Sequence, residues 1–559
     1  MQQSVSFTGG QAVVASLRAH HIEVVFGIPG VHNLPIYDAL YDEPGIRHVL
    51  ARHEQGAGYM ADGYARIAGR PGVALVITGP GVTNIATPLA DAYADSVPLL
   101  VIATSLPGKT DGRSWGRLHE LKDQLGLAQS LVGWCHEVQR VAEIPEAIAE
   151  ALRQTRAGRP RGAFLQIPLD VLEEQESISL AALEESDAEP PAAPSEEALR
   201  RAVELLRAAQ RPVILAGTGV SAAGANHELL RLAELLQAPV LLGGKSHDVL
   251  PNDHPLVITT RGAPSRTLGP LLSRSDLALV IGSKLGMQRT TLPALERSRS
   301  GPTEAGRLPL PERLIHIDID AGEIGRRYPA SVGLVADARL ALIALLEGLQ
   351  ENPGQYEDRR EEVAAVRAAL SKRAFQIYGE VMPWLEALRT ALPRESVVVA
   401  DMTMAGYAAA QVFPVYEPRS FIHASELCSI GTGLPLALGA QLAAQGRPVV
   451  ALCGDGGFLQ NVGELATAAQ ERIPVVTIVF NDASYTAVKN DQLQRFPGRS
   501  IATTLEPPDY VALAHAFRIE GQRVEAPEAL VALLARRIGQ PAEEARPLLI
   551  EVPLSQQSH

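Results

Sequence analysis

The chain has 559 residues, of which 46% are hydrophobic and 20% charged, and its formal net charge is −13 at pH 7. This length exceeds what one hydrophobic core supports, so several domains of ordinary globular composition are expected. The negative balance, with no run of Lys or Arg to offset it, argues against a nucleic-acid partner.

The three cysteines, Cys135, Cys428 and Cys453, stand in apolar surroundings without the spacing of metal ligands. Disulfide bonds and a zinc site are therefore not expected, and a reducing compartment is favoured. Residues 1–8 lack the pattern of a secretion signal, and no uncharged apolar run reaches membrane-spanning length. We therefore expect a cytoplasmic protein without a membrane partner.

Residues 1–172 alternate apolar runs with helical patterns, and the runs at residues 73–77 and 98–103 are typical of buried parallel strands. Residues 173–197 are acidic, rich in Ala and Pro and aperiodic, which predicts a linker. The sequence thus predicts a first α/β domain followed by a connecting segment.

A second alternating unit covers residues 198–350, with strand-like runs such as 212–216 and 277–281. Charge dominates residues 351–373, which predicts a solvated helix and connector as a second linker. Residues 374–559 form a third unit. Repeated strand–helix alternation predicts an α/β fold of three domains, each with a doubly wound parallel sheet.

The third unit contains two oxygen-bearing turns. An apolar run at residues 447–453 leads into Gly-Asp-Gly-Gly at 454–457, and a run at 473–480 leads into Asn481-Asp482. Because parallel strands end at one edge of a sheet, both turns should meet there. Their acids suit a hard divalent cation that keeps positions open for phosphate oxygens, and the glycines let a diphosphate approach a helix N-terminus.

This pattern resembles the cofactor motif of thiamine diphosphate enzymes, in which Gly-Asp-Gly precedes Asn-Asn at a similar spacing. Three further family landmarks appear: residues 25–30 (Val-Phe-Gly-Ile-Pro-Gly), 52–66 (Arg-His-Glu-Gln-Gly and following) and 78–84 (Thr-Gly-Pro-Gly-Val-Thr-Asn). Their order resembles the acetolactate synthase-like branch over nearly the whole chain.

That resemblance implies a pyrimidine-binding first domain, a structural central domain and a diphosphate-binding third domain. It also implies that the first domain of one subunit faces the third domain of another. We therefore expect a homodimer, or a dimer of dimers, with active sites at the interface between subunits.

The resemblance also implies roles for individual residues. Glu54 would bond the pyrimidine ring and activate the cofactor, in a pocket that excludes water. Ile430 would wedge the cofactor into its bent form, and the Cys428 carbonyl would accept from its amino group. The expected ligands of Mg²⁺ are Asp455, Asp482 and the backbone carbonyl of Ser484. The other expected cofactor contacts are Pro29, Gly30, Thr78, Asn84, Met402, Thr403, Gly456, Gly457 and Tyr485.

The chain departs from the family in two places. Asp482 stands where the second Asn is usual, which adds a negative charge that Mg²⁺ still tolerates. His119 stands where acetolactate synthases carry Gln, and decarboxylase relatives place proton-handling groups there. We consider His119 a candidate catalytic residue; the alternative is a surface histidine without a role.

The run at residues 119–124 (His-Glu-Leu-Lys-Asp-Gln) also resembles bacterial decarboxylases of 5-guanidino-2-oxopentanoate. Asp491 stands where acetolactate synthases carry an acceptor-pocket tryptophan. An acidic pocket formed by Glu120, Asp123 or Asp491 would suit a guanidinium tail. The alternative is that these acids are solvated surface charges.

In acetolactate synthases the central domain holds FAD. Residues 284–289 match the flavin-binding segment of those enzymes poorly, so FAD is possible but not favoured. The turns at 217–219 and 316–320 could contact an adenine nucleotide, although an empty domain would contain such turns as well.

The leading hypothesis is therefore thiamine diphosphate- and Mg²⁺-dependent decarboxylation of a small 2-oxo acid. The resulting carbanion would be protonated to an aldehyde or ligated to a second carbonyl, and 5-guanidino-2-oxopentanoate is one candidate substrate. Two alternatives stay open: the catalytic subunit of an acetolactate synthase, and an inactive cofactor-binding structural or regulatory subunit.

Overall fold

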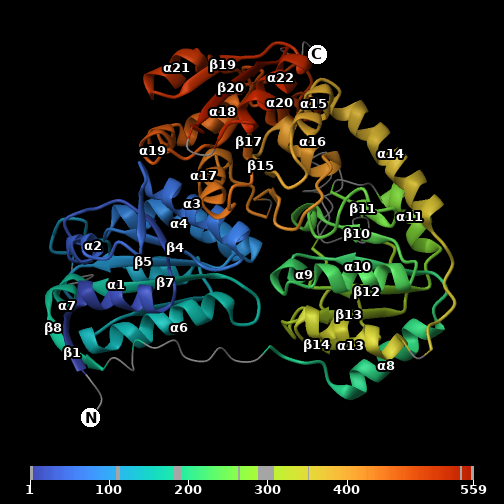
Figure 1. The fold of residues 1–559 in the computed structure, drawn as a ribbon, viewed down its shortest axis with the longest axis horizontal. Helices are drawn as coiled ribbons and strands as arrows, with labels where there is room; N and C mark the ends of the chain where they lie inside the picture. The colour runs from blue at the N-terminus through green and yellow to red at the C-terminus, as the bar shows by residue number, and fades with distance from the viewer. Residues whose placement is uncertain are drawn as a thin grey trace.

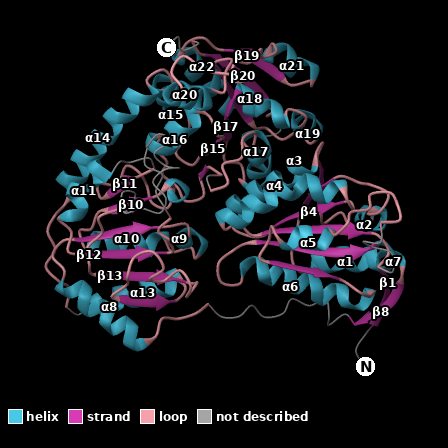
Figure 2. Cartoon of the chain, turned by 180° about the vertical axis from the view of Figure 1, so that it is seen from behind, coloured by secondary structure: helices cyan, strands magenta, loops and turns pink. Residues whose placement is uncertain are grey.

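The computed structural model describes residues 4–108, 114–179, 183, 191–261, 265–286, 308–350, 352–424, 426–541 and 544–555. Three α/β domains surround a common centre: the first in blue and teal, the second in green and yellow, and the third in orange and red (Figure 1). Each contains one six-stranded parallel sheet with helices packed on it (Figure 2). The predicted fold class is confirmed.

The first sheet has the strand order β3-β2-β4-β5-β7-β6. Its strands are β2 (Val24–Gly27), β3 (Arg47–Leu50), β4 (Gly72–Val76), β5 (Leu99–Ser105), β6 (Trp134–Glu137) and β7 (Gly162–Pro168). Its helices are α1 (Gly9–Ala19), α2 (Leu34–Tyr41), α3 (Glu54–Ala68), α4 (Pro80–Asp95), α5 (Gln124–Gln129), η1 (Val141–Glu143), α6 (Ile144–Arg156) and α7 (Leu169–Glu173). Both predicted strands of this domain are present, as the buried β4 and β5.

The central sheet has the order β11-β10-β9-β12-β13-β14. Its strands are β9 (Pro212–Ala216), β10 (Val240–Leu242), β11 (Val257–Thr259), β12 (Leu277–Ile281), β13 (Leu314–Asp318) and β14 (Val332–Val335). Its helices are α8 (Glu196–Ala208), α9 (Gly219–Ala222), α10 (Asn226–Leu235), η3 (Gly244–Ser246), α11 (Ser265–Ser273) and α13 (Ala338–Gln350).

The third sheet has the order β16-β15-β17-β18-β20-β19. Its strands are β15 (Val397–Ala400), β16 (Phe421–Ile422), β17 (Val449–Gly454), β18 (Val476–Asn481), β19 (Glu520–Arg523) and β20 (Leu548–Pro553). Its helices are α14 (Arg360–Tyr378), α15 (Met382–Ala391), α16 (Met404–Val412), α17 (Gly433–Ala443), α18 (Asp455–Phe458), η5 (Leu459–Asn461), α19 (Glu464–Gln470), α20 (Thr486–Arg495), α21 (Tyr510–Ala516) and α22 (Pro527–Ile538). Within the described part of the chain, no helix is long and apolar enough to cross a membrane.

The strand orders separate the domains into two kinds. Counted from the first strand of each domain, the first and third sheets both follow 2-1-3-4-6-5, whereas the central sheet follows 3-2-1-4-5-6. The second order is that of dinucleotide-binding sheets, in which a ligand crevice opens where the strand order reverses.

Helices α3 and α17 join the first and third domains. A Cβ added at Gly63 would lie 2.1 Å from the Leu436 carbonyl oxygen, and one at Gly439 would lie 1.8 Å from that of Met60. Only glycine therefore allows the two backbones to approach so closely. The two helices lie side by side in both views (Figures 1 and 2).

The first predicted linker is wrong at its start. Residues Gln175–Ser179 form β8, which pairs antiparallel with β1 (Ser4–Thr8). Ile178 is 2% exposed, although the residues beside it are polar. A single apolar residue gives no period to read, so the strand depends on a partner far away in the sequence.

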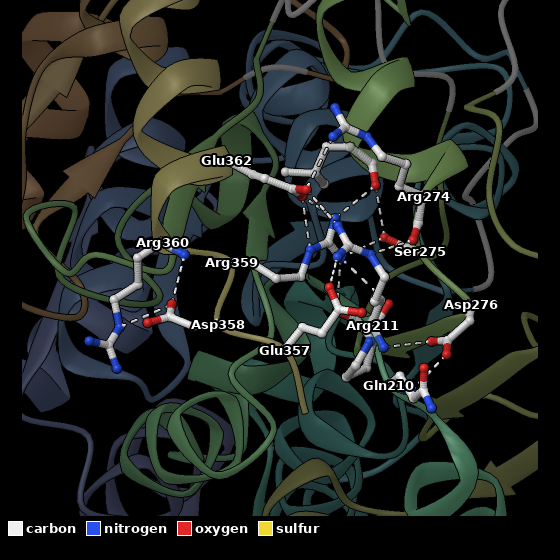
Figure 3. Close-up of polar contacts among 12 residues, drawn as sticks. Gln210, Arg211, Arg274, Ser275, Asp276, Glu357, Asp358, Arg359, Arg360 and Glu362 are labelled. Atoms are coloured by element: carbon white, nitrogen blue, oxygen red, sulfur yellow. Dashed lines mark hydrogen bonds and ion pairs between the residues drawn. The ribbon is translucent and has the colours of Figure 1, made fainter. Parts of the chain in front are cut away.

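The second linker is less solvated than predicted. Residues 360–378 form α14, so the predicted domain boundary at residue 374 falls inside this helix. Just before it, Arg359 is 1% exposed and donates to Ser275 Oγ (2.8 Å) and to the Leu271 carbonyl (2.9 Å). Its guanidinium also pairs with Glu362 at 2.8 Å, inside the network that Figure 3 shows. The linker is thereby fixed to the central domain.

We expect Arg359→Met to lower the free energy of unfolding of the central domain by about 1–3 kcal/mol, because the buried acceptors lose their charged donor, while Glu362 keeps Arg211 and Arg274. Differential scanning calorimetry would measure the change. The neighbouring Arg360 pairs with Asp358 while 54% exposed, so Arg360→Met should cost only about 0–1 kcal/mol. Equal losses in the two variants would contradict a specific role for Arg359.

Candidate active site

Glu54 begins α3, directly after the loop that follows β3. Its side chain is 9% exposed, and its Oε2 accepts a hydrogen bond from Asn84 Nδ2 at 2.9 Å. Glu54 is therefore largely buried, and its role toward a cofactor stays a prediction. Asn84, on the first turns of α4, fixes the direction of the carboxylate.

The start of α3 is held by the third domain. The Glu464 side chain accepts from the backbone N–H groups of Arg52 and His53, both at 3.1 Å. Glu464 is 1% exposed, and burial raises the pKa of its carboxyl group. Sequence reasoning missed Glu464, because nothing in α19 itself indicates a partner more than 400 residues away.

The remaining expected residues of the first domain lie in loops at the same carboxyl edge of the sheet. The Asn33 side chain accepts from Gly30 N at 2.7 Å and so fixes the Pro29-Gly30 turn. Thr78 N donates to Thr104 Oγ1 at 3.0 Å. The loop after β4 is therefore tied to the end of β5.

His119 lies beside this edge and has a histidine neighbour that the sequence did not reveal. Its ring stands 5.3 Å from that of His32, in an edge-to-face arrangement. The buried Nδ1 atoms of both rings have no hydrogen-bond partner among the described residues. Burial, and then the neighbouring His119, lower the pKa of His32. The edge thus presents two imidazoles with unused ring nitrogens.

The backbone of His119 has φ +64°, in the left-handed region that non-glycine residues rarely adopt. A Cβ at Gly79 would lie 2.2 Å from the His119 carbonyl oxygen, so the glycine is what allows this loop to pack there. Backbone strain of this kind persists where the surrounding structure fixes the residue.

The acidic turns of the third domain meet as predicted. Asp455 starts α18 after β17, and Asp482 follows β18. Burial, and then the charge of Asp482, raise the pKa of Asp455 to about 6. The Asp455 Oδ2 atom is buried without a hydrogen-bond partner in the described residues. Two close carboxylates with an unused oxygen form a site that a divalent cation would stabilise.

The backbone around Asp455 and Asp482 turns sharply. The backbone N–H groups of Gly456 and Ser484 favour the charged form of Asp455 and so partly oppose the rise of its pKa. Ala483 has φ +53°, which turns the chain sharply between Asp482 and Ser484. A Cβ at Gly456 would lie 2.4 Å from the Tyr485 ring, so that turn also requires glycine.

Asp401 ties two further loops together, and sequence reasoning missed it. It directly follows β15, is 1% exposed, and accepts from Met402 N at 2.7 Å and from Thr432 N at 3.3 Å. Thr403 lies next to Gly454, since a Cβ added at Gly454 would be 2.9 Å from Thr403 Oγ1. Asp401 thus holds the Met402-Thr403 turn near the start of α17.

Cys428 and Ile430 lie in the loop before α17. Cys428 has φ +60°, and Gly431 has φ +81°. The Gly431 carbonyl accepts from Asn461 Nδ2 at 2.7 Å, which anchors the end of this loop. Backbone strain of this kind persists where the surrounding structure fixes the residue, and a binding role for the Cys428 carbonyl stays a prediction.

The three acids considered for guanidinium binding have local partners. Asp123 caps α5 through Gly126 N, and Glu120 accepts from Arg117 N at 3.1 Å. Asp491 pairs with Arg495 at 3.1 Å. Whether they form one acidic pocket stays a prediction.

A cavity of about 1310 Å³ lies where the three domains meet. It opens at the carboxyl edge of the central sheet, and Gly217, Gly219, Gly282 and Asp318 line part of it. This is the point at which the strand order reverses, where open α/β sheets bind ligands. Residues 287–289 of the predicted flavin-contacting segment lie outside the described residues, so the expectation against FAD stays a prediction.

Comparison with known proteins agrees with this geometry. Residues 7–127, 199–345 and 401–552 match the N-terminal, central and C-terminal domains of thiamine pyrophosphate enzymes. A probable 2-ketoarginine decarboxylase of Pseudomonas aeruginosa is 38% identical over 92% of this chain and 89% of its own length. A probable acetolactate synthase large subunit of Methanococcus aeolicus is 31% identical over 93% and 88%. The isozyme 1 large subunit of Escherichia coli acetolactate synthase is 31% identical over 92% and 89%. The chain belongs to the thiamine pyrophosphate enzymes.

Proposed function

We propose that this protein is a thiamine diphosphate- and Mg²⁺-dependent decarboxylase of a small 2-oxo acid that releases an aldehyde. The observation that carries this proposal is the His32–His119 pair with its unused ring nitrogens, beside the edge that contains Glu54. Such groups can deliver a proton where a carbanion would otherwise attack a second carbonyl.

The residues present fit the cation and the cofactor. Asp455, Asp482 and the Ser484 carbonyl would hold Mg²⁺, and the unused Asp455 Oδ2 supports that assignment. Gly456 and Gly457 would receive the diphosphate at the start of α18. The other proposed contacts of the third domain are Met402, Thr403, Cys428, Ile430 and Tyr485. Those of the first domain are Pro29, Gly30, Glu54, Thr78 and Asn84.

When bound, the cofactor supplies a nucleophilic carbon that adds to the oxo group and accepts the electron pair left by carbon dioxide. Glu54 would share a proton with the pyrimidine ring, and Asn84 donates a hydrogen bond that orients the Glu54 carboxylate. His119 then hands a proton to the product carbon, and His32 orients the His119 ring.

For the substrate we propose 5-guanidino-2-oxopentanoate, that is, 2-ketoarginine. The relative that is 38% identical supports it by its name, and Glu120, Asp123 or Asp491 would suit the guanidinium group. The alternative is an acetolactate synthase, supported by relatives that are 31% identical. Asp491 at the place of the acceptor-pocket tryptophan speaks against it. An inactive subunit would have no need of both Glu54 and the acidic pair.

We further propose that the working unit is a homodimer, or a dimer of dimers, in which Glu54 of one copy faces Asp455 of another. Large apolar side chains stay exposed near both proposed half-sites. Those near the first are Val31, Leu34 and Leu118, and those near the second are Leu427, Val488, Phe496 and Ile501. Helix α20 has no buried residue in the single chain. Faces of this kind usually cover one another in an oligomer.

Glu54→Gln should slow exchange of the cofactor C2 proton by about 10²–10⁴-fold, because the amide cannot share the proton. Exchange measured by NMR after rapid acid quench would show it, with the exposed Glu23→Gln as the control. Wild-type exchange in Glu54→Gln would overturn the assignment.

The same variant tests the interface between copies. Glu54→Gln and Asp455→Ala each keep the residue that the other lacks. If the two residues meet across subunits, dissociating and mixing the two inactive variants should restore about a quarter of the wild-type activity, since half of the dimers are mixed and each has one intact site. If a mixture that is proven to contain mixed dimers stays inactive, the site is not shared between subunits.

Asp455→Ala should abolish Mg²⁺-dependent retention of thiamine diphosphate, because the cation links the carboxylates to the phosphates. Calorimetric titration at limiting Mg²⁺ would measure it. Asp482→Asn, which introduces the amide usual in this family, is the matched control and should keep binding. Unchanged affinity in Asp455→Ala would exclude this metal site.

His119→Ala should reduce aldehyde release from 5-guanidino-2-oxopentanoate by about 100-fold while leaving cofactor affinity unchanged. Carbon dioxide, aldehyde and acetolactate would be assayed with that substrate and with pyruvate. His136→Ala serves as the control, because His136 lies on β6 and pairs with Glu143. If His119→Ala loses only the formation of acetolactate, the synthase alternative is favoured. If the rate and the product ratio of His119→Ala are unchanged, His119 has no catalytic role.

A further inference from the structure

The loop that contains Cys428 and Ile430 is attached to the central domain by ion pairs. Lys245 Nζ, in η3, lies 3.1 Å from Glu426 Oε1, and Lys284 Nζ lies 3.4 Å from Glu426 Oε2. Lys245 also lies 3.5 Å from Asp95 Oδ1, to which the Glu426 backbone N–H donates at 3.2 Å. Side chains from two other domains therefore hold both the backbone and the carboxylate of Glu426.

The attachment continues into the first domain. Asp95, at the end of α4, pairs with Arg66 of α3 at 3.0 Å, and Arg66 pairs with Asp62 at 2.5 Å. The resulting chain of charges alternates in sign along its whole length. It links the helix that starts with Glu54 to the loop that carries Cys428. Three acids and three bases leave the chain of charges neutral.

The contacts of Asp95 and Lys245 are shielded from water, whereas Glu426 is 38% exposed. The side chain of Asp95 is 0% exposed and that of Lys245 is 17% exposed. Burial alone would raise the pKa of Asp95, but Arg66 and Lys245 outweigh it and keep that pKa below its ordinary value. Lys245 and Lys284 likewise outweigh burial and lower the pKa of Glu426. Ion pairs in such surroundings are screened little by salt, and removing one partner is costly.

The loop needs a fixed anchor at each end. Cys428 stands only two residues after Glu426 and has φ +60°, a conformation that a cysteine does not adopt without support. At the other end, Asn461 holds the Gly431 carbonyl. Residues 426–431 are thus a short strained segment fixed at both ends. At the first end, Asp95 of the first domain holds the Glu426 backbone, and lysines of the central domain hold its carboxylate.

We propose that Lys245 is a positioning residue for the cofactor: its contact with Glu426 keeps residues 426–430 in the conformation that presents the Cys428 carbonyl and the Ile430 side chain. This inference rests on the proposed placement of thiamine diphosphate against those two residues. It gives the central domain a part in building the active site, since a lysine of that domain sets the shape of a loop in the third.

The test uses Lys245→Met and Glu426→Gln in the full-length protein. Without cofactor, hydrogen–deuterium exchange of backbone amides in residues 426–432 should become faster in both variants. Thiamine diphosphate affinity and the C2-proton exchange rate should each fall about tenfold or more, because a displacement of about 1 Å in a positioning group costs up to about 100-fold. Glu426 is partly exposed, so Glu426→Gln should fold even if Lys245→Met does not.

Two controls separate positioning from a general loss of stability. Glu323→Gln breaks another contact between the first and central domains, Arg159–Glu323 at 3.5 Å, with side chains 18% and 7% exposed. It should leave all three measurements unchanged. Lys245→Arg keeps the charge and should restore loop protection and cofactor affinity, whereas a purely structural loss would follow the melting temperature in every variant.

The proposed cofactor site is tested separately by Ile430→Ala. If that variant binds thiamine diphosphate like wild type, the proposed site is wrong and this inference fails with it. If Ile430→Ala weakens binding while Lys245→Met and Glu426→Gln do not, the cofactor site stands and the positioning role of Lys245 is excluded. Unchanged amide exchange at residues 426–432 in both variants also excludes it.

Discussion

The contact between α3 and α17 is the interaction on which the rest of the candidate site depends. Gly63 and Gly439 let the two backbones touch, so the first and third domains meet at a fixed distance. Glu54 starts α3, and the Cys428 loop leads into α17. A larger side chain at either glycine would push the helices apart and move both groups at once. The close packing of the two helices therefore precedes any arrangement of catalytic side chains.

Buried polar side chains then fix the loops that this contact brings near. Glu464 holds the start of α3, Asp401 joins the loops before α16 and α17, and Gln124 accepts from Gly79 N at 2.8 Å. Among the described residues, Asp455 Oδ2 and the Nδ1 atoms of His32 and His119 belong to the buried polar atoms that have no hydrogen-bond partner. A buried polar atom without a partner is costly, so such atoms are expected where a ligand completes the structure.

The central domain differs from the other two in its strand order, and it does not carry the acidic turns. It nevertheless lines the large cavity, and its Lys245 reaches the loop of the third domain. The linker that follows the central domain is also attached to it, since Arg359 is buried among acceptors of that domain (Figure 3). Lys245 and Arg359 are therefore structural contacts rather than solvated surface charges, because both are largely enclosed and paired.

The sequence by itself determined the three-domain α/β fold, since apolar runs such as those of β4, β5, β9 and β12 show their burial locally. It also determined that Asp455 and Asp482 would meet, because parallel strands share a carboxyl edge. Only the tertiary structure decided the contacts between residues that are distant in the sequence. Four contacts join segments that are far apart in the chain. His32 lies beside His119, Glu464 bonds the start of α3, β8 pairs with β1, and Arg359 is buried against the central domain. No local period or spacing encodes such contacts, because they depend on how the domains pack.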